Sequence, residues 1–294
     1  MIYTSQNVID EFEALPERVV SLVPSVSDSL FALGLSSKVV GITDYCPSPD
    51  PSESEPRRVG GTKNPDPDLI KNLSPDLVIA NQEENDRAQI DMLAEAGLKI
   101  WLTFPKSIDA AIVDLRILGR IFGLKQNALA ILELLEKTYD WMRLANLGET
   151  APKFFCPIWE DNKQTWWMTF NDQTFAHDIL SLCGGVNAFA ERERKYPLSA
   201  DLGKTTPKMD KERDTRYPRV SMEEVVQSNP EIVILPSEPY TFREKDVKRI
   251  SDLLSTTPAA QNGNIVLIDG RLITWHGVNM AHAFDELPRI FEIM

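Results

Sequence analysis

Three side chains that can ligate a metal ion follow predicted strands: Cys46, Cys156 and His276. Thiolates and imidazoles are the ligands that soft and borderline metal ions prefer, so these residues are candidates for a direct metal site. No pair of them has the spacing of a zinc motif. A free cysteine is also commonly a small buried hydrophobe, and this alternative stays open for both cysteines.

A histidine can instead serve as the axial ligand of a metal that a macrocycle already holds. His276 is the first candidate for this role because it follows a strand, and His177 is the second. His282 falls in a predicted amphipathic helix at the end of the chain, and we interpret it as structural. The third cysteine, Cys183, makes the set odd in number and widely spaced, which does not predict a disulfide framework.

Aromatic side chains are the other group with a recognisable chemistry. Several follow predicted strands or occupy the short β-like run 164–170, namely Tyr45, Trp159, Trp166, Trp167, Tyr240 and Trp275. Ligands bind beyond the carboxyl ends of parallel strands, and a broad aromatic surface suits a large, flat or macrocyclic ligand. The alternative is that these rings belong to ordinary core and rim packing.

Motifs of common enzymes are missing from the sequence. It contains no GxSxG, Walker A, GxGxxG or HExxH segment. Glu83 and Glu84 follow a predicted strand and have the chemistry of an acid and base pair, but a solvated loop is the better explanation of both residues. We therefore expect no catalytic residue.

Composition excludes two classes of partner. The 294 residues include 31 basic and 44 acidic side chains, for a net charge of -13, which disfavours nucleic acid. No run of about 18 apolar residues is present, so we expect no membrane span. The first residues lack the features of a secretory signal, which indicates a cytoplasmic protein or one whose signal is not part of this chain.

The elements that must position these residues alternate between strand and helix. Strands are predicted at 18–24, 39–43, 77–80 and 99–103 with helices between them, and Ser25 and Asp28 predict a capping box for the first helix. A long helical pattern from about 125 to 147 follows. We predict an α/β fold of two similar lobes with mainly parallel sheets, residues 1–122 and 149–294, bridged by one long rigid helix at 123–148, with a ligand cleft between the lobes.

The second half of the sequence repeats the first. Residues 66–79 and 221–234 both run from a helix into a strand, with an N-cap residue, a carboxylate two places later and a proline seven places after that. The repeat does not contain the charged, proline-containing stretch 191–216, which we interpret as a surface insertion that is either functional or disordered.

The repeated carboxylates are Asp68 and Glu223. At the second position of a helix, a negative charge is stabilised by the helix dipole, and this is a sufficient structural reason for either residue. One such carboxylate in each lobe also suggests docking onto a two-fold symmetric partner with positive pockets.

These features together resemble the solute-binding proteins of metal-chelate ABC importers, the helical-backbone metal receptor type. The resemblance covers nearly the whole chain and is strongest in 18–25, in the helix that ends at Gly34, in the repeated segments 75–79 and 230–234, and in 178–185 and 216–224. The chain is most similar to the cobalamin-binding branch. The first-lobe aromatic of that branch, expected near Thr62, is absent.

The resemblance implies a function and further site residues. The ligand is expected to be a metal chelate, most of all a cobalt corrinoid, or else haem or a ferric siderophore, and the protein needs no cofactor of its own. Tyr217 matches the cleft aromatic, with Trp167 and Met168 opposite it. Asp68 and Glu223 match the residues that dock to arginines of the permease dimer. We expect an extracytoplasmic monomer; the alternative is a cytoplasmic chelate carrier or sensor, or a metal-dependent enzyme that uses Cys46, Cys156 and His276.

Overall fold

The computed structural model describes residues 1–11, 14–145, 151–208 and 213–292, and the chain separates into two compact units. The first unit contains residues 1–138 and 275–281, and the second contains residues 139–274 and 282–294. Each unit is built around a parallel sheet, which confirms the predicted α/β class. The lobe limits predicted from the sequence stay a prediction.

The first unit is built on one parallel sheet of six strands. Their order across the sheet is β1-β6-β5-β2-β3-β4, and every neighbouring pair is parallel. The chain moves outward from β2 to β4 and then returns to β5 on the other side of β2, so the strand order reverses between β2 and β5. The strands are β1 (Ile2–Tyr3), β2 (Val19–Ser21), β3 (Val39–Ile42), β4 (Arg57–Arg58), β5 (Leu77–Asn81) and β6 (Ile100–Thr103).

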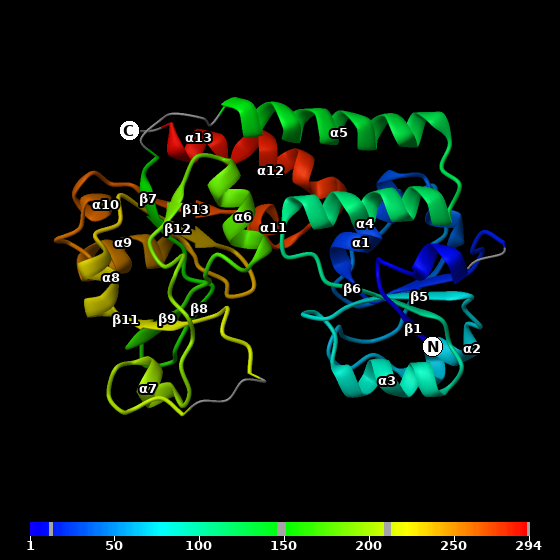
Figure 1. The fold of residues 1–294 in the computed structure, drawn as a ribbon, viewed down its shortest axis with the longest axis horizontal. Coiled ribbons are helices and arrows are strands. Elements are labelled where there is room, and N and C mark those ends of the chain that lie inside the picture. Colours follow the sequence, from blue (N-terminus) through cyan, green and yellow to red (C-terminus); the bar gives the residue numbers. More distant parts are fainter. Residues whose placement is uncertain (12–13, 146–150, 209–212, 293–294) are drawn as a thin grey trace. The chain divides into compact units, whose positions relative to one another are not determined.

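Helices cover both faces of this sheet. Figure 1 shows α1 and α4 on one side of β5 and β6 and α3 on the other, which is why the central strands are apolar on both faces. The helices are η1 (Val8–Glu11), α1 (Pro24–Ala32), η2 (Ser36–Lys38), α2 (Pro67–Asn72), α3 (Arg87–Glu95), α4 (Ile108–Ile121) and η3 (Gly277–Asn279). The long helix α5 (Gln126–Ala145), of 20 residues, leads on into the second unit.

The start of α1 differs from the prediction. The helix begins at Pro24, and its N-cap Val23 provides no side-chain cap, so the capping box expected at Ser25 and Asp28 is wrong. Proline is favoured at the first helical position because its fixed φ suits a helix and its missing N–H is not needed there. Ser25 therefore lies inside the first turn.

The repeat predicted from the sequence is confirmed in the structure. Asp66 is the N-cap of α2 and Ser221 is the N-cap of α8 (Met222–Ser228), and a strand follows each helix. Ser74 and Asn229, at matching places in the repeat, both adopt a left-handed backbone conformation, with φ of 47° and 53°. Residues other than glycine rarely adopt this conformation, so its occurrence at both places shows that the chain leaves the two helices in the same way.

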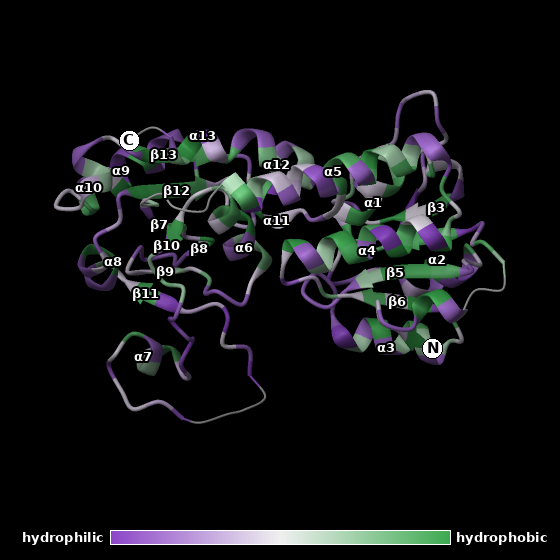
Figure 2. Ribbon diagram, turned by 45° about the horizontal axis from the view of Figure 1, so that its top comes forward, coloured by the Kyte–Doolittle hydropathy of each residue, from purple (hydrophilic) through white to green (hydrophobic). Residues whose placement is uncertain are grey.

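The second unit contains two sheets. A parallel sheet has the order β10-β7-β12-β13, and a smaller antiparallel sheet has the order β11-β9-β8. Figure 2 shows the strand β12 of the parallel sheet as a hydrophobic segment. The strands are β7 (Lys153–Phe155), β8 (Trp159–Glu160), β9 (Trp166–Met168), β10 (Val186–Asn187), β11 (Arg219–Ser221), β12 (Ile232–Pro236) and β13 (Ile265–Ile268).

The two sheets of the second unit share a core. One buried cluster joins β7, β12 and β13 to Trp167 of β9 and to Ile250 of α9. Besides α8, the helices are α6 (Phe175–Leu182), α7 (Leu198–Asp201), α9 (Glu244–Leu253), α10 (Pro258–Gln261), α11 (Arg271–Thr274) and α13 (Pro288–Phe291), together with α12 (Met280–Glu286), which begins in the part of the chain that belongs to the first unit.

Candidate functional site

The antiparallel sheet of the second unit brings several of the predicted ligand residues together. Trp159 pairs directly with Met168, and Trp166 lies two residues before Met168 on the same strand. Because side chains alternate along a strand, these three residues share one face of the sheet. All three are at least partly exposed, and Trp159 is 46% exposed.

Tyr240 extends this face from the loop after β12. Its ring centroid lies 5.5 Å from that of Trp159 in an edge-to-face arrangement, which aromatic pairs prefer. We call Trp159, Trp166, Met168 and Tyr240 the aromatic face. It offers two indole rings, a phenol and a thioether on adjacent backbone segments, which is a suitable surface for a flat apolar ligand.

Trp167 lies on the opposite side of the same sheet, although the sequence grouped it with the ligand-facing residues. It is 2% exposed and packs edge-to-face on Phe155. Its indole N–H donates a 2.9 Å hydrogen bond to Glu160, and Arg249 binds both carboxylate oxygens of Glu160 at 2.8 Å. Trp167 is thus part of the core beneath the aromatic face.

Tyr217 precedes the strand β11, next to the aromatic face. Its ring is partly exposed and lies 5.2 Å from the guanidinium carbon of Arg216, a cation–π contact. Arg216 is buried and pairs with Asp214 at 2.7 Å. The ring therefore rests on a guanidinium that is itself fixed in place.

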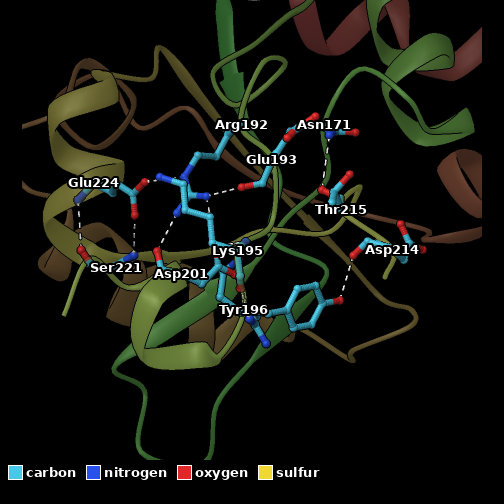
Figure 3. Close-up of polar contacts among 11 residues, drawn as sticks. Asn171, Arg192, Glu193, Lys195, Tyr196, Asp201, Asp214, Thr215, Ser221 and Glu224 are labelled. Carbon is cyan, nitrogen blue, oxygen red and sulfur yellow. Dashed lines mark hydrogen bonds and ion pairs between the residues drawn. The ribbon is translucent and has the colours of Figure 1, made fainter. Parts of the chain in front are cut away.

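The charged stretch 191–216 is anchored by a buried carboxylate. Asp201, at the end of α7, accepts a hydrogen bond at 3.0 Å from Nη1 of Arg192 (Figure 3). It accepts another at 2.6 Å from Nε of Arg219. It also accepts the backbone N–H groups of Lys195 and Arg219. Arg192 in turn binds Glu224 of α8 at 2.9 Å. The stretch lacks hydrophobic periodicity because these ion pairs and hydrogen bonds, and not apolar packing, hold it on the second unit.

In the first unit, Tyr45 follows β3 and is 70% exposed. A Cβ atom built on Gly61 would lie 3.6 Å from Cε2 of Tyr45, so the ring stands beside the backbone of Gly61. Gly61 immediately precedes Thr62, where the sequence lacks the aromatic residue of the cobalamin-binding branch. An aromatic ring thus reaches this region from a different loop.

Cys46 follows Tyr45 in the chain, but its side chain does not lie at the surface. It is buried, and its Sγ lies 3.1 Å from the hydroxyls of both Ser27 and Thr43. Burial raises the pKa of the Cys46 thiol. The side chain is therefore a protonated, hydrogen-bonded thiol rather than a thiolate.

A pair of buried asparagines, Asn81 and Asn85, closes the carboxyl edge of the first sheet, and no sequence pattern predicted this structural role. Asn85 donates from Nδ2 to the carbonyls of Leu22 at 3.1 Å and Thr62 at 2.9 Å, and its Oδ1 accepts the backbone N–H of Asn81. Asn81 in turn donates to Thr103 at 3.2 Å. These contacts join the ends of three strands to the Thr62 loop, at the point where the strand order reverses.

His276 belongs to the first unit despite its late position in the chain. It is the N-cap residue of η3, which packs on α1: the backbone N–H of Val278 donates to Ser29 Oγ at 3.2 Å. Gly277 has φ of +91°, and a Cβ there would lie 2.2 Å from Ser29 Oγ, so only glycine fits. Burial lowers the pKa of His276 to about 4, which leaves the imidazole neutral near pH 7. The preceding Trp275 is partly exposed.

The structure offers no support for a direct metal site. Within residues 1–11, 14–145, 151–208 and 213–292, no three His, Cys, Asp or Glu side chains are grouped closely enough to hold a metal ion. Cys156 is fully buried in the second unit, and burial raises the pKa of its thiol. Burial also raises the pKa of Cys183, to about 12. A protonated thiol is a poor metal ligand, because the thiolate is the form that binds.

His177 has neighbours that resemble a catalytic triad, but the hydrogen-bond donor and acceptor roles at its two ring nitrogens are the reverse of those in a triad. Its Nε2 lies 3.3 Å from Ser181 Oγ, and its Nδ1 lies 3.3 Å from Asn187 Nδ2. Because Asn187 Oδ1 accepts the backbone N–H of Phe189, Nδ2 faces the histidine as a donor, and Nδ1 must accept. The proton is then on Nε2 and points at the serine, whereas a general base needs a free Nε2 there.

Asp68 and Glu223 occupy the helical positions that the sequence predicted. Each is the second residue of its helix, α2 or α8. The side chain of Asp68 is 88% exposed, and Glu223 is also exposed. Hydrogen bonds from its own backbone N–H and from Ser221 lower the pKa of Glu223. Both residues thus present a carboxylate to solvent from the first turn of a helix.

Comparison with solved structures shows the same fold in several binding proteins. The periplasmic haem-binding protein of Roseiflexus sp. RS-1 superposes with a TM-score of 0.72 at 20% identity, over 94% of this chain and 97% of the other. The periplasmic vitamin B12-binding protein of Vibrio cholerae gives a TM-score of 0.72 at 19% identity, over 95% and 97% of the two chains. These structures confirm the predicted two-lobe α/β fold class.

Sequence comparison leads to the same group of proteins. The vitamin B12-binding protein of Yersinia pestis (strain Pestoides F) is 25% identical over 219 residues, which is 74% of this chain and 69% of that protein. These relatives are named as binding proteins and not as enzymes, in agreement with the prediction for this chain.

No helix in the described part of the chain is both long and apolar enough to cross a membrane.

The family model named "Periplasmic binding protein" matches residues 19–272, which is most of the chain. The chain therefore belongs to the periplasmic binding protein family, the group that its sequence motifs indicated.

Proposed function

We propose that the protein captures a metal chelate, most of all a corrinoid, and delivers it to an ABC importer. The observation that carries this proposal is the aromatic face of the second unit. Trp159, Trp166, Met168 and Tyr240 place large, rigid and weakly polar side chains together on an accessible surface. Such side chains bind the face of a macrocycle by apolar contact and dispersion.

The kinds of ligand named for the relatives agree with this chemistry. The curated relatives are vitamin B12-binding proteins, and solved structures of the same fold include haem-binding proteins of Roseiflexus and of Vibrio cholerae. Corrin and porphyrin rings are both broad metal-bearing macrocycles. A corrinoid is the first choice because the sequence relatives bind it, and haem is the second.

Tyr45 is the residue through which the first unit is proposed to contact the ligand. It is exposed, it follows a strand at the carboxyl edge of the parallel sheet, and its ring stands beside Gly61. It thereby replaces the aromatic residue that the cobalamin-binding branch carries near Thr62. Trp275 and His276, with Tyr217 in the second unit, complete the proposed ligand-binding set. Trp167 is proposed to support the aromatic face from below.

Asp68 and Glu223 are proposed to dock the protein on the permease dimer. Both carboxylates are exposed at the first turn of short helices that occupy equivalent places in the repeat. Two equivalent charges on one chain suit a partner that presents the same basic pocket twice. This role implies an extracytoplasmic location, and a carrier or sensor in the cytoplasm would not need it.

Retention of coloured chelates tests the proposal. The purified chain is incubated separately with cobalamin, cobinamide, haem and a ferric siderophore, desalted, and examined by visible spectroscopy. We expect a corrinoid spectrum to stay with the protein at a ratio near one per chain. Retention of no chelate would contradict the proposed function, and retention of haem alone would correct the ligand. Genes for a permease and an ATPase beside the gene would support transport, whereas their absence would favour the cytoplasmic carrier.

A further inference from the structure

Three guanidinium groups surround one tyrosine ring in the second unit. The guanidinium carbons of Arg194, Arg213 and Arg219 lie 4.8, 4.9 and 5.4 Å from the ring centroid of Tyr196. The Tyr196 hydroxyl is held by the carbonyl of Asp214 at 2.8 Å (Figure 3). Cation–π contacts favour each guanidinium singly, but three like charges around one ring repel one another.

Most of the cations in this region have a carboxylate partner. Arg219 and Arg192 both bind Asp201, Arg192 also binds Glu224, and Arg216 binds Asp214. With two carboxylates for Arg192 and Arg219, their charges are balanced. Asp201 is therefore already shared by two guanidinium groups, those of Arg192 and Arg219.

Arg194 differs from these residues. Its side chain makes no ion pair within the described ranges of the chain, and its buried Nε has no hydrogen-bond acceptor there. Burial, and then the nearby charge of Arg219, lower the pKa of Arg194. A buried donor without an acceptor is costly, and a charged one is more so. The residue is still partly exposed, so a ligand has access to part of the side chain.

This cluster borders the aromatic face. Arg219 pairs directly with Met168 across β11 and β9, and directly paired residues project from the same face of a sheet. Arg219 is therefore paired with Met168 and also contacts the ring of Tyr196, which Arg194 contacts as well. The cluster and the aromatic face therefore meet at the paired residues Met168 and Arg219.

We propose that Arg194 binds an oxyanion, a carboxylate or phosphate group at the edge of the captured chelate. This inference rests on the proposed function and defines its ligand further as an anionic chelate. An oxyanion supplies the acceptors that the guanidinium lacks and offsets the repulsion around Tyr196. The planar fork of donors in arginine matches a carboxylate or phosphate in geometry, and the aromatic ring holds that fork in place.

The test compares haem, which carries two carboxylates, with its dimethyl ester, which carries none. Dissociation constants are measured by absorbance titration of the full chain at constant ionic strength. We expect the wild type to bind haem at least tenfold more tightly than the ester. In Arg194→Gln that preference should fall below threefold, and in Lys208→Gln, which removes an exposed charge from the same stretch, it should persist.

Two further arms keep the test decisive. Arg194→Lys retains the charge without the planar fork and should give an intermediate preference. Inorganic phosphate at millimolar concentration distinguishes a free oxyanion from a carboxylate on the chelate. If free phosphate occupies the site, it should weaken the binding of haem in the wild type but not in Arg194→Gln. If the carboxylate of haem alone occupies it, phosphate should have no effect.

Equal binding of haem and its ester by the wild type, with no change in Arg194→Gln, would overturn the inference and leave the proposed function standing. If the protein retains no haem, the phosphate arm decides by thermal unfolding. A rise in melting temperature with phosphate that Arg194→Gln abolishes and Lys208→Gln keeps supports the site. An equal rise in all three proteins, or none, overturns it. Failure to retain any chelate at all is the separate outcome that contradicts the proposed function.

Discussion

Asp76 and Glu231 make the same contact in the two units. The carboxylate of Asp76 accepts the backbone N–H of Arg18 at 2.9 Å, and that of Glu231 accepts the backbone N–H of Lys153 at 2.7 Å. In return, the backbone N–H of each acidic residue donates to the carbonyl of the same partner. Each repeat thus ties the end of its helix to the start of the neighbouring strand, at a position where the sequence alone shows only an acid after a proline.

Removal of either carboxylate should therefore destabilise its own unit. We expect Asp76→Ala and Glu231→Ala each to lower the free energy of unfolding by about 1–3 kcal/mol, because a charge-assisted hydrogen bond to the backbone is lost. Urea unfolding followed by circular dichroism measures the change. Glu231→Gln keeps an acceptor oxygen and should lose less. Equal losses in Glu231→Ala and Glu231→Gln would show that the hydrogen bond is not the cause.

Asp201 should be the most sensitive residue of the stretch 191–216. Its side chain is fully buried between Arg192 and Arg219, so Asp201→Ala leaves two guanidinium groups without their shared partner. We expect a loss of about 3–5 kcal/mol in the free energy of unfolding and rapid proteolysis within 191–216. Asp214→Ala, which removes a more exposed carboxylate that binds one guanidinium instead of two, should cost less than Asp201→Ala. Similar losses in both variants would contradict this account.

Asp114 should make stability depend on pH. It lies buried in α4, and burial raises its pKa from 3.8 to about 6 against the opposing hydrogen bond from Ser5. Between these values the folded chain holds a proton that the unfolded chain has released. The free energy of unfolding therefore falls as pH rises from about 4 to 6, by about 3 kcal/mol from this group.

Replacement of Asp114 by asparagine tests this directly. Asp114→Asn should unfold at higher denaturant concentration than the wild type at pH 7, and the difference should vanish near pH 4. Asp109→Asn, an exposed carboxylate on the same helix, serves as the control and should not show the gain. If Asp114→Asn is less stable than the wild type at pH 7, the folded protein stabilises the ionised carboxylate of Asp114, and the prediction is wrong.

Trp159 should dominate the affinity for the chelate. It is the most exposed ring of the aromatic face and supports Tyr240 at 5.5 Å, so Trp159→Ala removes one contact and loosens another. We expect the dissociation constant for cobalamin, or for haem if haem is retained, to rise about 10- to 100-fold, which corresponds to about 1.4–2.7 kcal/mol. Trp141→Ala, at an exposed tryptophan of α5, is the matched control and should leave affinity unchanged.

Charge reversal at the two repeated helices should abolish docking. Asp68→Arg combined with Glu223→Arg places positive charge where the partner is expected to present arginines, and we expect at least a tenfold loss of association with the solubilised importer in biolayer interferometry. Glu95→Arg combined with Asp252→Arg changes the net charge equally from exposed helical positions and should have little effect. The docking proposal is wrong if both double variants bind alike.

Local features account for what the sequence could predict. The N-caps Asp66 and Ser221, the places of Asp68 and Glu223, and the strands that follow depend on neighbours within about ten residues, so a sequence repeat reveals them. The capping box predicted for α1 was wrong for an equally local reason, because Pro24 occupies the first helical position before Ser25.

Long-range pairing explains most of what was missed. Trp166 and Trp167 are adjacent and point to opposite faces, and only the pairing of Trp167 with Val220 and Glu160 shows which of them is buried. The bond between Asp201 and Arg219 joins residues 18 positions apart in a stretch without periodicity. No sequence pattern marks such a contact, because neither residue repeats at a spacing that a helix or strand requires.

The late segment Trp275–Ala281 has a consequence for how the protein is made. The contact between Val278 and Ser29 spans 249 residues, so the first unit receives its last piece only after nearly the whole chain has left the ribosome. Until then, the surface of α1 around Ser29 remains uncovered. The unit translated first therefore cannot be completed until the second unit is almost fully translated, and a fragment that stops at residue 138 would lack the glycine that fits against Ser29.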